Sequence, residues 1–115
     1  MNMRVVSEHD DLTHIALEGR LDTAGVQDIE LKFLAHTASR GKPTLIDMSG
    51  VEYVSSLGMR LILSSMQTLK KKGTQGLLFA VQPLVKETLE LAGLDELLAS
   101  SDNEEEVIRT LTTLP

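Results

Sequence analysis

The fold is decided by the stretch Leu45-Ile46-Asp47-Met48-Ser49-Gly50-Val51-Glu52-Tyr53-Val54-Ser55-Ser56-Leu57-Gly58-Met59-Arg60. Its apolar beginning predicts a strand over residues 44–48, and the residues that follow predict a short loop. A helical pattern then runs from about Ser56 to Lys72 and stops at Gly73. Two serines therefore stand where a helix begins, a place where unpaired backbone N–H groups and the positive end of the helix dipole gather.

The rest of the chain alternates between strand and helix patterns. Further strands are predicted over residues 3–7, 12–17 and 76–81, with Gly19 ending the second strand and the last of them read as a central parallel strand covered on both faces. Further helices begin near Asp22 or Thr23, at Pro83, and after Asp102 or Asn103. This order predicts one small α/β domain over residues 1–115, with a mixed four-stranded sheet and about four helices packed against it.

Composition excludes several classes of function. The 115 residues carry a net charge of −6 and only 3 % aromatic residues, which argues against binding nucleic acid. The absence of cysteine excludes disulfides and thiolate chemistry. No apolar run has the length of a signal peptide or a membrane span, so we expect a cytoplasmic protein without a cofactor, monomeric by default, with a homodimer as the alternative.

The two adjacent serines allow a structural and a functional role side by side. Ser55 is expected to cap the helix, which contributes ~1 kcal/mol, while the hydroxyl of Ser56 faces outward. A phosphate on Ser56 would add roughly −1.5 to −2 charges. The helix dipole and Arg60, one turn further on, would partly stabilise that charge, and the same charge would repel an acidic partner.

Catalysis and metal binding find little support in the residues. A catalytic serine needs a base within hydrogen-bond reach. The three histidines, His9, His14 and His36, have no spacing that suggests a catalytic triad with Ser56, and the G-x-S-x-G pattern of serine hydrolases is absent. Asp22 and Asp47 have no acidic neighbour at metal-ligand spacing. We therefore expect no enzyme, no catalytic residue and no metal site.

The predicted second helix has more apolar surface than one stripe needs. Met59, Leu63 and Met66 form an additional row at four- and three-residue spacing. This row either packs on a neighbouring helix or forms a strip that binds a partner beside Ser56, a use for which methionine is well suited. Gly58, in the first turn, indicates close backbone packing or access for a partner.

The serine segment as a whole resembles the STAS domain of bacterial anti-sigma factor antagonists. The resemblance covers nearly the whole chain, with support from Gly19-Arg20-Leu21-Asp22, from Gly76 to Val81 followed by Pro83, and from the turn at Leu89 to Leu94. It implies a partner switch: a GHKL-type serine kinase that doubles as the anti-sigma factor binds the unmodified antagonist and then phosphorylates it. A PP2C-type phosphatase reverses the modification.

The same resemblance implies the residues of the site. The modified position is Ser56, with Ser55 as the second choice, and Asp22 matches an acidic position near the same surface. The expected partner-binding residues are Asp22, Ser55, Ser56, Gly58, Met59, Arg60, Leu63 and Met66. Two alternatives stay open: a STAS subunit of a lipid-transport ATPase complex, and a regulatory scaffold that is not phosphorylated.

Overall fold

Strands and helices alternate along residues 1–112, the part of the chain that the computed structural model describes. The strands are β1 (Asn2–His9), β2 (Leu12–Leu21), β3 (Thr44–Val54), β4 (Gly76–Phe79) and β5 (Ser100–Ser101). The helices are α1 (Thr23–His36), α2 (Ser56–Lys71), α3 (Pro83–Leu91) and α4 (Glu104–Thr112). None of the helices within these residues is long and apolar enough to cross a membrane.

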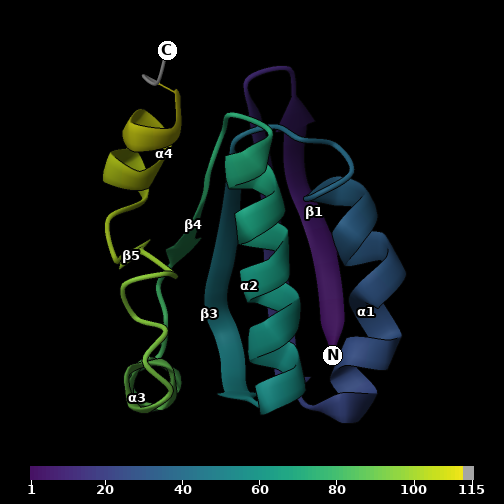
Figure 1. The fold of residues 1–115 in the computed structure, drawn as a ribbon, viewed down its shortest axis with the longest axis vertical. Coiled ribbons are helices and arrows are strands. Elements are labelled where there is room, and N and C mark those ends of the chain that lie inside the picture. Colours follow the sequence, from purple (N-terminus) through teal and green to yellow (C-terminus); the bar gives the residue numbers. More distant parts are fainter. Residues whose placement is uncertain (113–115) are drawn as a thin grey trace.

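The strands form one mixed sheet in chain order, β1-β2-β3-β4-β5. β1 runs antiparallel to β2, and each later neighbour pairs in parallel. Helices α1 and α2 connect successive parallel strands and lie side by side on the sheet (Figure 1). Because β2 and β3 are parallel, their last residues, Leu21 and Val54, pair with each other immediately before α1 and α2 begin.

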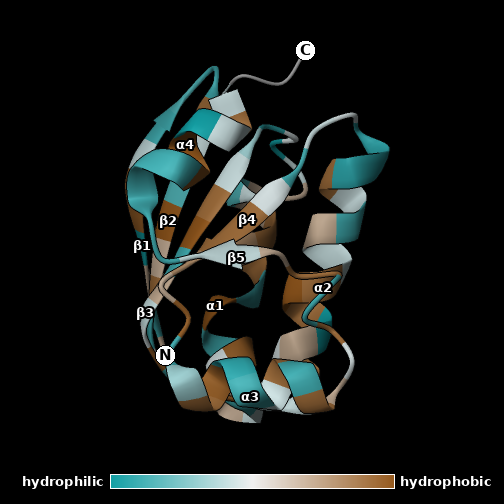
Figure 2. Cartoon of the chain, turned by 90° about the vertical axis from the view of Figure 1, so that its left-hand side faces the viewer, coloured by the Kyte–Doolittle hydropathy of each residue, from teal (hydrophilic) through white to brown (hydrophobic). Residues whose placement is uncertain are grey.

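Side chains that alternate along β3 separate two cores. Ile46 and Met48 belong to the main core, which α1, α2 and α3 cover. Leu45 points to the opposite face and packs in a smaller core with Val107 and Leu111 of α4. Figure 2 shows β4 between α4 on one side and α2 on the other. The sheet is therefore covered on both faces at β3 and β4.

The sheet has five strands rather than the predicted four. The additional strand, β5, contains only Ser100 and Ser101, which pair with Leu78 and Phe79 of β4. Two polar residues cannot show an apolar alternation, so this strand depends on tertiary pairing and left no pattern in the sequence.

Two predicted boundaries in the sheet were wrong. Gly19 does not end β2, which continues to Leu21, and the predicted loop after Met48 is the second half of β3. β2 and β3 remain paired beyond these points, with shifts in register near Glu18 and Gly19. Gly50 packs closely on Glu18, because a Cβ added at Gly50 would lie 2.8 Å from the Glu18 Cγ. Pairing along the neighbouring strand therefore keeps glycine-containing segments extended.

Strand β4 confirms the prediction of a parallel strand with both faces covered, but it ends at Phe79 rather than Val81. Leu78 lies in the main core, and Leu77 and Phe79 pack against the core under α4. The strand stops because Ala80 adopts a positive φ of 56°, which turns the chain out of the sheet.

The predicted helix ends are confirmed. Asp22 caps α1, and Asn103 caps α4 by accepting the Glu106 N–H at 3.0 Å. Helix α3 closes through Gly93, whose φ is +74°, followed by a hydrogen bond from the Leu94 N–H to the Leu89 carbonyl (2.9 Å). This closure is a left-handed glycine terminator.

Candidate functional site

The carbonyl oxygen of Leu21 joins the starts of two helices. It accepts the backbone N–H of Ser55 at 2.9 Å and the Ser55 hydroxyl at 3.0 Å. The Ser55 Oγ in turn accepts the Gly58 N–H at 3.2 Å and so caps α2. Asp22, next to Leu21, caps α1 by accepting the Gly25 N–H at 2.8 Å. The N-termini of α1 and α2 are thereby held at the same end of the sheet (Figure 1).

Ser55 and Ser56 have different environments although they are adjacent. Ser55 is half-buried, and its hydroxyl both donates and accepts a hydrogen bond. Ser56 is the first residue of α2 and is exposed, without a hydroxyl hydrogen bond to any residue in the range 1–112. The prediction that Ser55 caps the helix while Ser56 faces outward is confirmed. An enzyme can reach the Ser56 hydroxyl without disturbing the cap.

The surroundings of Ser56 favour negative charge. Neither α1 nor α2 has an acidic residue in its first turn, and both helix dipoles present their positive ends here. Arg60 is exposed one turn after Ser56. Asp22 lies at the start of α1, and its pKa is lowered mainly because the Gly25 N–H bonds the carboxylate, with a smaller contribution from Arg20. The site therefore combines a hydrogen-bonded carboxylate with exposed basic side chains.

An exposed aromatic–cation pair stands beside the helix starts. The guanidinium carbon of Arg20 lies 4.3 Å from the centre of the Tyr53 ring, and the Arg20 Nε lies 3.7 Å from the Asp22 carboxylate. Sequence reasoning missed this pair. Both residues fell outside the predicted strands, and the one signal present was that each stands two residues before a helix cap. The structure pairs Arg20 of β2 with Tyr53 of β3.

The predicted apolar row on α2 is divided between surface and interior. Met59 and Leu63 are partly buried and pack against the main core from its edge. Met66 is only 7 % exposed, and its sulfur lies so close to Gly76 that a Cβ there would be 2.1 Å away. Gly58 is also buried, directly on Leu21. Met59 and Leu63 thus contribute to the exposed side of α2 that runs on from Ser56, and Gly58 shapes the start of this surface from below, whereas Met66 lies further along the helix against Gly76.

The histidines lie away from Ser56. His36 is in the last turn of α1, at the opposite end of that helix from Asp22, and it pairs with Glu8. His14 is buried in β2, and His9 is at the end of β1, where its Nδ1 accepts the Asp11 N–H. Ser56 therefore has no histidine partner to act as a general base.

These features define a small α/β domain with a mixed sheet, in which two helix N-termini and an exposed serine lie at the same end of the sheet. The chain belongs to the STAS domain family, whose family model matches residues 3–108.

Named relatives extend this assignment. The chain is 24 % identical over 84 residues to BtrV of Bordetella bronchiseptica, which is assigned as an anti-sigma factor antagonist, with 73 % of this chain and 72 % of BtrV covered. The fold of the present chain is similar to that of the anti-sigma factor antagonist SpoIIAA in its unphosphorylated form, with a TM-score of 0.77, 19 % identity and 99 % of both chains covered. The Bacillus SpoIIAA structure in the phosphorylated form gives a TM-score of 0.69 at 20 % identity, covering 95 % of this chain and 99 % of that one.

Proposed function

We propose that this protein is an anti-sigma factor antagonist that works as a phosphorylation-controlled partner switch. With Ser56 unmodified, it binds a GHKL-type serine kinase that serves as the anti-sigma factor, and the sigma factor is released. The observation that carries this proposal is the free, exposed hydroxyl of Ser56 at the first position of α2, beside a cap made by a different serine. A structural relative has been solved in both phosphorylation states.

The covalent step is a phosphoryl transfer from ATP. The Ser56 oxygen forms a bond to the γ-phosphorus, the bond from that phosphorus to the β-phosphate oxygen breaks, and ADP leaves while the hydroxyl proton passes to a base of the kinase. This chain supplies the acceptor and no catalytic group. A PP2C-type phosphatase hydrolyses the ester and restores the hydroxyl. Because ATP is the donor, we place the cycle in the cytoplasm.

Electrostatics at the interface account for release. The phosphate adds roughly −1.5 to −2 charges at a position that the partner covers. A complex held by ~10 kcal/mol is broken when charge repulsion and desolvation remove several kcal/mol. Because Ser56 is exposed and makes no internal hydrogen bond, the fold need not rearrange.

The proposed contact surface surrounds Ser56. It combines Asp22 and Arg60 with the apolar edge of α2 that Met59 and Leu63 provide. The stacked Arg20 and Tyr53 extend it across the ends of β2 and β3, and such side chains often carry a large share of binding energy. The surface is therefore mixed, with charges around an apolar centre.

Replacing Ser56 with glutamate tests the release step. The Ser56→Glu variant should bind the kinase about a hundredfold more weakly than the unmodified chain, which corresponds to about 2.7 kcal/mol. The Ser56→Ala variant should bind normally and stay bound when ATP is added. Calorimetric titration with a purified GHKL-type serine kinase that binds the unmodified chain measures both affinities.

A matched control separates the position of the charge from its presence. Ser39 is exposed beyond the end of α1, away from the helix starts, so Ser39→Glu adds the same charge at a remote place. It should bind like the unmodified chain. Equal affinities for Ser56→Glu and Ser39→Glu would count against the switch, and binding to a transporter ATPase without phosphate transfer would favour a lipid-transport role instead.

A further inference from the structure

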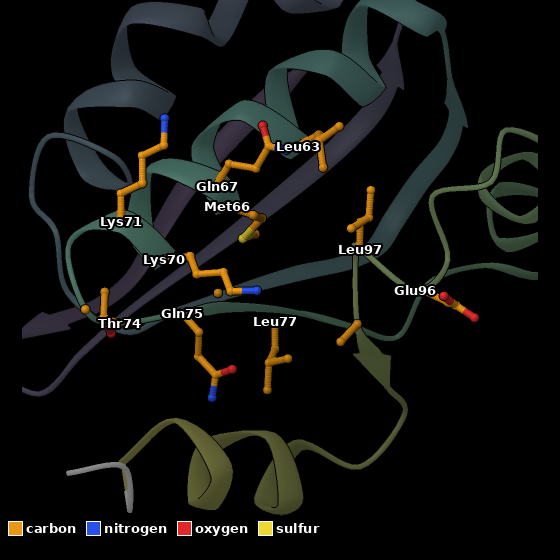
Figure 3. A pocket seen from close by; sticks show the side chains of 13 residues that line it. Leu63, Met66, Gln67, Lys70, Lys71, Thr74, Gln75, Leu77, Glu96 and Leu97 are labelled. Carbon is orange, nitrogen blue, oxygen red and sulfur yellow. The ribbon is translucent and has the colours of Figure 1, made fainter.

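A groove of about 820 Å³ lies along the second half of α2, far from Ser56. One wall is the helix itself, the floor is the start of β4, and the opposite wall is the segment of residues 96–99 that leads into β5 (Figure 3). Ser56 and Lys70 are 14 positions apart, which at 1.5 Å per residue places the groove about 20 Å along the helix from the proposed phosphorylation site. The groove is therefore a second site.

The floor of the groove is firmly packed. Met66 and Leu69 pack on Gly76, where an added Cβ would lie 2.1 Å from the Met66 sulfur and 3.2 Å from the Leu69 Cδ1. Leu63 forms part of the helix wall, and Leu97 faces it from the other side while remaining 60 % exposed. An exposed leucine opposite an apolar helix wall leaves an apolar channel open to solvent.

One lysine, Lys70, extends into this channel, whereas the side chain of the next lysine, Lys71, points away from it (Figure 3). The carboxylate of Glu96 also points away from the groove. Within residues 1–112 neither Lys70 nor Lys71 makes an ion pair or a side-chain hydrogen bond. The next lysine, Lys72, already donates to the Ala38 carbonyl at 2.6 Å. The groove therefore has an apolar interior and an unneutralised positive edge, on a chain whose net charge is −6.

We propose that this groove binds a free, single-chain anionic amphiphile of the fatty-carboxylate class. The hydrocarbon chain lies between Leu63 and Leu97, and the carboxylate lies at the ammonium group of Lys70. The volume falls within the range of about 300–1,000 Å³ that is common for small-molecule sites. A lysine stem covers apolar surface while its ammonium group remains available for an anion, so both parts of the ligand are matched.

Sodium decanoate, kept below the concentration at which it forms micelles, is the probe. Calorimetry should show saturable binding of one molecule per chain, and the perturbed backbone amides in the NMR spectrum should lie in residues 63–77 and 96–99. Decanol, which has the same hydrocarbon chain without the charge, should bind about fivefold more weakly. This factor corresponds to about 1 kcal/mol, the upper end of the free energies measured for exposed ion pairs.

Matched variants separate groove binding from general effects. Lys70→Gln should weaken decanoate binding about fivefold and leave decanol binding unchanged, whereas Lys71→Gln and Lys86→Gln, whose side chains lie outside the groove interior, should change neither. Leu97→Gln should weaken both ligands, whereas Leu91→Gln, exposed but outside the groove, should not. All these side chains are exposed, so the fold tolerates the substitutions.

Several outcomes would overturn the inference. These are an absence of saturation, perturbed amides outside the groove, equal affinities for decanoate and decanol, and binding only when decanoate is carried in phosphatidylcholine vesicles. Ser56→Ala should bind decanoate like the unmodified chain. Failure of the groove would therefore leave the phosphorylation switch untouched, and failure of the switch would leave the groove untouched.

Discussion

At the residue scale, Leu21 links the cap of α2 to the packing of its first turn. Its carbonyl accepts two hydrogen bonds from Ser55, and Gly58 lies against both that oxygen and the Leu21 side chain. This contact supports the close-packing interpretation of Gly58. It also fixes the direction in which Ser56 leaves the cap, because the preceding residue cannot rotate without losing these bonds.

Replacing Gly58 with alanine should destabilise the fold. Although alanine is the better helix former by about 1 kcal/mol, its Cβ would lie 2.5 Å from the Leu21 oxygen and 2.7 Å from the Leu21 Cγ. We expect a net loss of about 1–3 kcal/mol in the free energy of unfolding, measured with urea. Gln67→Ala, on the exposed side of α2, should change the free energy of unfolding by no more than about 0.5 kcal/mol relative to the unmodified chain. A stabilised Gly58→Ala variant would show that the contact yields easily.

At the scale of elements, the helices were more predictable from the sequence than the strands. Helix caps are local signals: Ser55 caps α2 as predicted, and Asp22 and Asn103, each one of two predicted candidates, cap α1 and α4. The second half of β3 and all of β5 depend on neighbouring strands, so polar or glycine-containing segments there resembled loops. Local chemistry sets helix ends, whereas pairing between distant segments sets strand lengths.

Helix α4 covers a buried histidine that makes stability depend on pH. His14 is 8 % exposed, and its Nε2 has no hydrogen-bond partner among residues 1–112. Burial is the main cause that lowers its pKa below the usual 6.5; Arg4 of β1 lowers it further, and Glu104 of α4 and Asp47 of β3 partly oppose the shift. The folded state therefore binds fewer protons than the unfolded state in acid.

Acid should accordingly weaken the fold through His14. Because its folded pKa is depressed, this contribution to stability is complete above about pH 6.5 and declines as the pH falls below it. Between pH 7.5 and pH 5.5, the free energy of unfolding measured with urea should fall more for the unmodified chain than for His14→Gln. His9→Gln, at an exposed position, should behave like the unmodified chain. An identical pH dependence in His14→Gln would exclude this linkage.

At the scale of the whole molecule, α2 carries two surfaces, which meet at Leu63. Its N-terminus carries the exposed Ser56, and its second half forms one wall of the groove. The exposed serine beside a helix cap was predictable because the two serines are adjacent in the sequence and lie at a helix start. The groove was not, since its walls come from residues 63–77 and 96–99, and a pattern within either segment does not show that they face each other.

The most direct test of the switch is to identify the phosphorylated residue. The chain is incubated with ATP and the purified GHKL-type serine kinase that binds it, then digested, and the phosphopeptides are mapped by mass spectrometry, with Ser56→Ala and Ser55→Ala in parallel. Because only Ser56 combines exposure with a free hydroxyl at this helix start, we predict phosphate on Ser56 in the unmodified chain and in Ser55→Ala, and none in Ser56→Ala. Phosphate on Ser55, or persistent phosphorylation of Ser56→Ala, would contradict the account.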